Sequence, residues 1–357
     1  MGKLLKTTTR GVAWSTLSSV IRNIVQLIQI IILTKILQKS DFGLIALANV
    51  VLGFIQIFLD MGLSVGILHK QNISKNQYSS LFWLNIISGV LLTGIIGLSA
   101  PLISKIYNEP LLIPIISLLG LSIFFSSLGS QHKIVQQKEL RFKYIAIIDI
   151  ITSAVIFAVA IIFARLGYGV YSLVYSTLAG SLVSSLIFLI IGLYKDKNIR
   201  FHFRFNDTIP FLKIGVFQIG SSILDFFSRQ LDIMFIGSVF GKEVLGLYSL
   251  CKKIVQTVFG TLNPIFTKVL TPLLAKLQSN IENMRDVYLK IIETLAIINI
   301  PIYLLVSIFS FGILSIMYGE QYTEGSFILS ILSIHYGILS MGNPIGSLQI
   351  ALGRTDL

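Results

Sequence analysis

Ten long apolar segments run through this chain of 357 residues, and each is long enough to cross a bilayer as a helix. Their approximate bounds are 12–33, 43–67, 80–103, 111–131, 144–164, 170–193, 211–237, 245–268, 290–316 and 326–350. A helix satisfies its own backbone hydrogen bonds in lipid, so the segments predict helices and not strands. Only 12% of the residues are charged, about half the roughly 25% of an average soluble domain. The sequence therefore predicts an all-α integral membrane protein with about ten transmembrane helices.

The basic residues are concentrated in alternate connections between these segments. Of the 28 Lys and Arg residues, 19 lie in connections on the side of the N-terminus, 5 lie on the other side and 4 lie inside segments. Cytoplasmic connections carry the excess of Lys and Arg in membrane proteins, so the N-terminus is predicted to be cytoplasmic. The net charge of +12 is then a topology signal, and no nucleic-acid partner is predicted.

The sequence shows no pattern typical of catalysis, metal binding or a cofactor. The single cysteine, Cys251, excludes an internal disulfide, and no C-x-x-C or H-x-x-x-H spacing indicates a metal site. No histidine stands with a nucleophile at a recognisable spacing, and the connections on the predicted outer side are short. We therefore expect no enzymatic activity, no metal and no cofactor.

An internal repeat appears when the sequence is shifted by 203 residues, because the first two segments then fall on the seventh and eighth. Four identities in nine positions result, which pair Lys39 with Lys242, Gly43 with Gly246, Leu44 with Leu247 and Leu47 with Leu250. Chance similarity between apolar segments is the alternative. Both copies start from the same side of the membrane, and transporters with such repeats commonly bind substrate at the repeat interface. The repeat predicts a six-helix bundle at 1–200 and, at 201–357, the first four helices of a second, incomplete bundle around a central cavity.

Polar groups inside the segments are costly and usually face a cavity or a partner. The shift of 203 residues aligns one polar trio with another: Arg22, Gln26 and Gln29 with Asp225, Arg229 and Asp232. Offsets of 0, 4 and 7 put each trio on one helix face, so two related helices would line one cavity. We take these six as candidate substrate-binding residues. Alternatively, Asp225, Arg229 and Asp232 only neutralise one another, because their spacing permits intrahelical ion pairs.

Other ionisable residues in the segments have two interpretations each. Lys252 and Lys253 are candidate binding residues for an anion, or they extend their ammonium groups to the membrane interface. Asp60 and Glu293 are candidate coupling carboxylates that would bind a cation, or they cap a helix near the interface. Asp149 lies near the predicted cytoplasmic edge, and we expect no site role for it.

Seven short motifs stand in order along nearly the whole chain. They are Asp41-Phe42-Gly43-Leu44, Phe82-Trp83-Leu84-Asn85, Leu140-Arg141-Phe142-Lys143, Gly167-Tyr168-Gly169-Val170-Tyr171-Ser172-Leu173-Val174, Ser228-Arg229-Gln230-Leu231-Asp232, Leu245-Gly246-Leu247-Tyr248-Ser249-Leu250 and Gly353-Arg354-Thr355-Asp356-Leu357. With them the chain resembles the bacterial polysaccharide flippases of the Wzx type, in particular the colanic-acid-exporter-like branch. These proteins belong to the multidrug/oligosaccharidyl-lipid/polysaccharide exporter superfamily.

The resemblance implies two six-helix bundles around a central cavity lined by the first and seventh spans. It also implies flipping of undecaprenyl-diphosphate-linked oligosaccharide across the bacterial inner (plasma) membrane by alternating access, for the biosynthesis of O-antigen lipopolysaccharide, capsule or exopolysaccharide. Arg22 and Arg229 would contact the diphosphate, since guanidinium suits phosphate oxygens. Membrane lipid, a glycan polymerase and assembly proteins are the implied partners.

Two other functions stay open. The first is a cation-coupled exporter of small molecules or drugs from the same superfamily. The second is a non-transporting membrane partner of a glycan assembly complex, because family members continue through further spans whereas this chain ends after ten.

Overall fold

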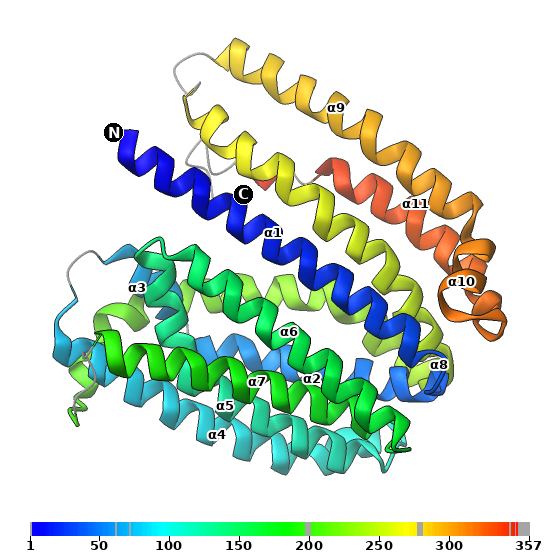
Figure 1. Ribbon diagram of the computed structural model, residues 1–357, viewed down its shortest axis with the longest axis horizontal. Coiled ribbons are helices and arrows are strands. Elements are labelled where there is room, and N and C mark those ends of the chain that lie inside the picture. Colours follow the sequence, from blue (N-terminus) through cyan, green and yellow to red (C-terminus); the bar gives the residue numbers. More distant parts are fainter. Residues whose placement is uncertain are drawn as a thin grey trace. The chain divides into compact units, whose positions relative to one another are not determined.

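The computed structural model describes residues 2–60, 63–70, 73–196, 201–276, 281–342, 344–346 and 348, and every regular element in them is a helix (Figure 1). The elements are α1 (Gly2–Leu33), α2 (Lys39–Asp60), α3 (Leu63–His69), α4 (Lys75–Tyr107), α5 (Leu112–Lys138), α6 (Phe142–Arg165), α7 (Tyr171–Ile191), η1 (Gly192–Asp196), α8 (Phe205–Lys276), α9 (Ile281–Ile308), α10 (Ser310–Tyr318), η2 (Glu320–Gly325) and α11 (Ser326–Gly342). The predicted all-α class is confirmed. The motif at 353–357 lies outside the described residues.

Nine segments of the described residues are long and apolar enough to cross a membrane. One of them, Ile219–Thr261, has 43 residues and covers both the seventh and the eighth predicted spans. A helix of that length would measure about twice the hydrocarbon thickness of a bilayer. Gly241 interrupts the segment with φ 79° and ψ −178°, so two helices meet there. The counts of nine and ten differ only in how this segment is divided.

The second predicted span corresponds to two described helices. The pattern predicts one helix over 43–67, but α2 ends at Asp60 and the short helix α3 begins at Leu63. A carboxylate oxygen of Asp60 accepts hydrogen bonds from the backbone N–H and the hydroxyl group of Ser64. Residues 61 and 62 between the two helices lie outside the described residues.

The chain forms two compact units, residues 1–246 (unit 1) and 247–357 (unit 2), and α8 continues from one into the other. In unit 1, α4 packs on α5, both α5 and α6 pack on α7, and α1 packs on α6. In α2 and in α5, half of the residues in the most apolar 18-residue stretch are buried, whereas in α1 the buried share is 17%. The boundary predicted at residue 200 separates two repeats of equivalent helices, whereas the boundary at residue 246 separates two compact units. The predicted boundary between repeats stays a prediction.

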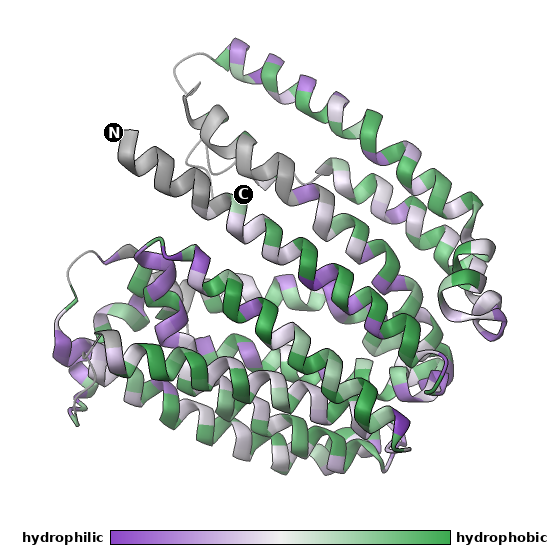
Figure 2. Cartoon of the chain, in the orientation of Figure 1, coloured by the Kyte–Doolittle hydropathy of each residue, from purple (hydrophilic) through white to green (hydrophobic). Residues whose placement is uncertain are grey.

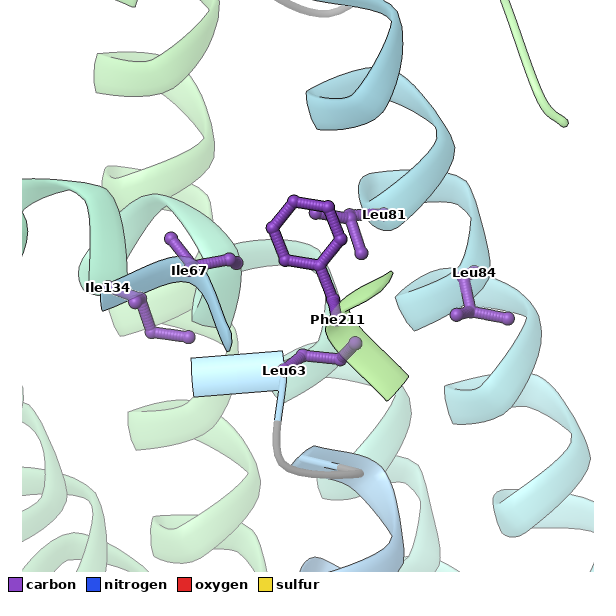
Figure 3. Packing of buried hydrophobic residues seen from close by; sticks show 6 residues of the cluster. All are labelled: Leu63, Ile67, Leu81, Leu84, Ile134 and Phe211. Atoms are coloured by element: carbon purple, nitrogen blue, oxygen red, sulfur yellow. The ribbon is translucent and has the colours of Figure 1, made fainter. Parts of the chain in front are cut away.

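The beginning of α8 is held firmly on unit 1. Phe211 is fully buried in a cluster with residues of α3, α4 and α5 (Figure 3), which are Leu63, Ile67, Leu81, Leu84 and Ile134. Nearby, the Ser80 hydroxyl accepts a hydrogen bond from the backbone N–H of Arg204 and donates one to Asp207. These contacts explain why unit 1 extends past residue 200.

Unit 2 has its own small core. In it, α9 packs on α11, and Leu270, Leu274 and Met284 form a buried cluster. The buried Cys251 thiol lies 3.5 Å from the carbonyl oxygen of Gly325. The cysteine is thus a packed apolar residue.

The exterior of the helices is apolar. On α4, Leu91, Leu98 and Leu102 are 61%, 84% and 64% exposed. Figure 2 shows such apolar residues along the helices of unit 1, with hydrophilic residues gathered near α3 and the start of α4. A surface of this kind suits hydrocarbon and not water.

Candidate functional site

A pocket of about 370 Å³, lined mainly by polar residue types, lies between α1 and α6 in unit 1. Its lining residues are Arg22, Asn23, Val25, Gln26 and Gln29 from α1, and Asp149, Thr152, Ser153 and Ile156 from α6. All three polar residues predicted on the first span therefore line one pocket. Their offsets on α1 place them on the face that packs against α6.

The charges of this pocket centre on Asp149. One carboxylate oxygen of Asp149, Oδ2, lies 3.7 Å from Nη1 of Arg22, and the other, Oδ1, accepts a hydrogen bond of 3.2 Å from Nζ of Lys133 on α5. The Asp149 side chain is only 16% exposed, against 45% for Arg22 and 37% for Lys133. Two cations share one carboxylate, so the cluster carries a formal charge of +1. All three residues lie in candidate membrane spans, where an excess charge requires water or an anion nearby.

The lining also offers neutral hydrogen-bonding groups. The Thr152 hydroxyl is buried and has no hydrogen-bond partner among the described residues. Gln29 is buried at 8% exposure, with an amide that both donates and accepts. Cations beside amide and hydroxyl groups suit a ligand that is anionic and rich in oxygen, such as a phosphate that carries a sugar.

The second predicted trio lies on the part of α8 that belongs to unit 1. Nη2 of Arg229 and Oδ2 of Asp225 are 3.9 Å apart, and both side chains are about three-quarters exposed at 74% and 75%. Asp232 accepts a hydrogen bond from the backbone N–H of Ile233. The intrahelical Asp225–Arg229 pair is therefore present, yet both groups stay accessible. A cavity shared with the first trio stays a prediction.

Two glycines at equivalent repeat positions bring α2 and α8 into close contact. A Cβ atom on Gly43 would lie 1.9 Å from the carbonyl oxygen of Lys242, and one on Gly246 would lie 1.8 Å from that of Lys39. Gly43 thus meets Lys242, and Gly246 meets Lys39, which is the repeat equivalent of Lys242. Such reciprocal contacts are those of an interface with twofold symmetry. This reciprocity supports the repeat over chance similarity.

The other candidate residues do not join the pocket between α1 and α6. Lys252 is buried in unit 2, with Nζ 6.0 Å from the centre of the Tyr248 ring, and Lys253 is half-buried beside it. Asp60 binds Ser64, which matches its interpretation as a helix cap. Glu293 is exposed on α9.

From the sequence we expect no site role for Asp149 and no relation between Lys133 and Arg22, whereas the structure places both near Arg22. They lie 16 positions apart on different helices, so no local spacing connects them. One signal was present, since Asp149 is the only acidic residue between Phe142 and Arg165.

Comparison with known proteins identifies the family. Residues 32–326 match the model of a family described as "Polysaccharide biosynthesis protein". The chain is 30% identical over 359 residues to the lipopolysaccharide biosynthesis protein WzxC of Escherichia coli (strain K12), across 99% of this chain and 72% of that protein. It is 29% identical over 360 residues to the teichuronic acid biosynthesis protein TuaB of Bacillus subtilis (strain 168), across 100% of this chain and 74% of that protein.

The fold also matches a solved structure, "Lipid II flippase MurJ, inward closed conformation". The TM-score is 0.80 at 14% sequence identity, over 96% of this chain and 76% of that one. This likeness concerns the fold alone. The family match over most of the chain and the identity with WzxC together show that this multi-pass membrane protein belongs to the polysaccharide biosynthesis family, with WzxC among its relatives.

Proposed function

We propose that this protein moves lipid-linked oligosaccharide repeat units, carried on undecaprenyl diphosphate, from the inner to the outer leaflet of the bacterial plasma membrane. The glycan and the diphosphate cannot cross hydrocarbon unaided, because the transfer of unpaired charge into it is prohibitive. A polar passage within the protein would shelter this head group while the polyprenyl tail stays in lipid. The N-terminus lies in the cytoplasm in this proposal, as the distribution of Lys and Arg predicts.

The observation that carries the proposal is the cationic pocket at Arg22. Arg22 lies with a second cation, Lys133, one carboxylate and several amide and hydroxyl groups, within candidate membrane spans. In the proposed mechanism, Arg22 and Arg229 contact the diphosphate, while Gln26 and Gln29 hydrogen-bond to the first sugar. Lys252 and Lys253 add positive charge, and Asp60 and Glu293 are the carboxylates proposed for coupling.

The names of the relatives support a glycan substrate. WzxC is named for lipopolysaccharide and TuaB for teichuronic acid, so the two are associated with different polymers. A substrate class defined by its lipid diphosphate carrier is compatible with both names. A glycan polymerase and assembly proteins are the proposed partners.

Deletion of the gene in its native host tests this function. We expect loss of one surface polysaccharide and accumulation of its lipid-linked repeat unit in the inner leaflet, with recovery on expression of the wild-type chain. Unchanged surface polysaccharide together with new sensitivity to cationic drugs would instead indicate a small-molecule exporter.

A further inference from the structure

We propose that Asp149 is an internal competitor of the substrate, which binds Arg22 and Lys133 in place of the substrate's phosphate and so keeps the head group from binding too tightly. The inference rests on the function proposed above and deepens it. It assigns Asp149 and Lys133 to the proposed binding site. It also explains why a carboxylate lies in a pocket that is proposed to bind an anion.

The geometry places Asp149 where an anionic ligand would bind. Its two oxygens face two different cations, with Oδ1 toward Lys133 of α5 and Oδ2 toward Arg22 of α1. A phosphate group offers oxygens in a similar spread, and guanidinium and ammonium are its usual partners in proteins. The carboxylate therefore mimics the group that the pocket is proposed to hold.

The contact between Asp149 and Arg22 is of a kind that a ligand can replace. Its length of 3.7 Å is too great for a hydrogen bond, and the Arg22 side chain is 45% exposed. In the same pocket, the Thr152 hydroxyl is buried without a partner among the described residues. A phosphate oxygen bound at Arg22 would accept a hydrogen bond from this hydroxyl, which lines the same pocket.

The charges explain how competition helps transport. With Asp149 ionised, the cluster carries a formal charge of +1, which attracts a diphosphate. Asp149 also repels the diphosphate, since both are anions in a site of reduced dielectric constant. A transporter has to release its substrate on the far side, and very tight binding would slow that step.

A purely structural role makes a different prediction. If Asp149 only holds α1, α5 and α6 together, its neutralisation loosens the pocket and weakens ligand binding. If Asp149 competes with phosphate, its neutralisation strengthens binding. Neutralisation of Lys133 weakens phosphate binding under competition, because it removes an attraction and frees Asp149 to pair with Arg22.

The test measures binding of farnesyl diphosphate to the purified full chain in lipid nanodiscs, with farnesol as the uncharged match. We expect Asp149→Asn to bind farnesyl diphosphate about tenfold more tightly than the wild type, because one like-charge repulsion is removed. Asp149→Glu should bind as the wild type does, and Lys133→Gln should bind more weakly. Glu139→Gln is the matched control, because it removes one negative charge from an exposed ion pair with Arg141 and should change nothing.

The outcomes separate the two claims. If the wild type binds farnesyl diphosphate but Asp149→Asn binds it equally or more weakly, the competitor role is wrong and the proposed function stands. If the wild type binds farnesyl diphosphate no better than farnesol, the proposed function itself is contradicted, and the competitor role with it. Thermal unfolding of each variant shows which proteins are folded. Should Asp149→Asn fail to fold, unchanged binding by Lys133→Gln would overturn the inference.

Discussion

Lys242 donates a hydrogen bond of 2.8 Å from its Nζ to Oε2 of Glu109 and so ties the residue after the break in α8 to the turn between α4 and α5. Glu109 is held in position for this contact. Its backbone N–H donates to the carbonyl oxygen of Ser104, and Asn108 before it takes a left-handed conformation with φ 52°. The pair lies one helical turn before the glycine contact between Gly43 and Gly246, so charge and close packing act at one end of α2.

The Lys242–Glu109 pair should contribute measurably to stability. We expect Lys242→Glu and Glu109→Lys each to lower the unfolding temperature in detergent, and the exchanged double variant to recover part of the loss. The coupling energy should be about 1 kcal/mol, at the upper end for a partly exposed pair. The Arg141–Glu139 pair, whose side chains are both 40% exposed, serves as the control and should show a smaller coupling. Additive effects of the two changes would contradict this role.

The glycine contact should tolerate no side chain. Gly43→Ala would place a methyl group inside van der Waals distance of the backbone of α8, and we expect a loss of about 1–3 kcal/mol from overpacking. Gly246→Ala should behave alike, as the repeat requires. The control is Gly94→Ala on α4, where no other atom lies within 4 Å of the added methyl group. Equal unfolding temperatures for Gly43→Ala and Gly94→Ala would mean that α2 and α8 do not meet at these glycines.

The cluster around Phe211 should anchor α8 on unit 1. Phe211→Ala removes a fully buried ring, and we expect a loss of about 3–5 kcal/mol in unfolding free energy. Phe201→Ala is the matched control, since that ring is 98% exposed and its truncation should have little effect. Limited proteolysis between residues 196 and 205 offers a second measurement, and Phe211→Ala should accelerate cleavage there. Similar stability of the two variants would contradict the anchoring role.

Asp60 has two proposed roles that one pair of variants separates. As a cap of α3, Asp60 is replaceable by Asn, whose amide oxygen accepts the same hydrogen bonds, and only Asp60→Ala loses about 1 kcal/mol. As a coupling carboxylate, Asp60 needs its charge, so Asp60→Asn abolishes transport without loss of stability. Export of surface polysaccharide by cells with each variant is the measurement, beside the unfolding temperature. The coupling proposal predicts loss of export with Asp60→Asn, and export retained by Asp60→Asn together with destabilisation by Asp60→Ala would leave Asp60 a cap alone.

Much of the fold follows from the sequence because membrane helices are long and obey one strong rule, the internal satisfaction of backbone hydrogen bonds. The all-α class and the helices of the spans required little more than length and hydropathy. The shift of 203 residues also predicted a relation between Gly43 and Gly246, and the structure brings these two glycines together. The hydrogen bonds from Ser64 to Asp60 were not foreseen, because hydropathy does not report side-chain contacts within an apolar segment.

The site was predictable only in part. The face of α1 with Arg22, Gln26 and Gln29 was visible from helical periodicity, which relates residues of one helix. The partner groups Asp149 and Lys133 come from other helices, and tertiary packing alone sets which helices meet. Their contacts with the pocket therefore could not be predicted from the sequence.

The central claim is that Arg22 in its polar pocket serves the passage of a diphosphate-linked head group across the membrane. The most direct measurement is transfer of a fluorescent polyprenyl-diphosphate sugar between the leaflets of vesicles that contain the purified protein, read by quenching from outside. We predict that the wild type transfers the lipid and that Arg22→Ala, although folded, does so at less than about a tenth of that rate, because 1.4 kcal/mol of lost interaction corresponds to tenfold. Arg229→Ala should likewise be folded and defective. Equal transfer by Arg22→Ala and the wild type, or wild-type vesicles no faster than protein-free ones, would contradict the account.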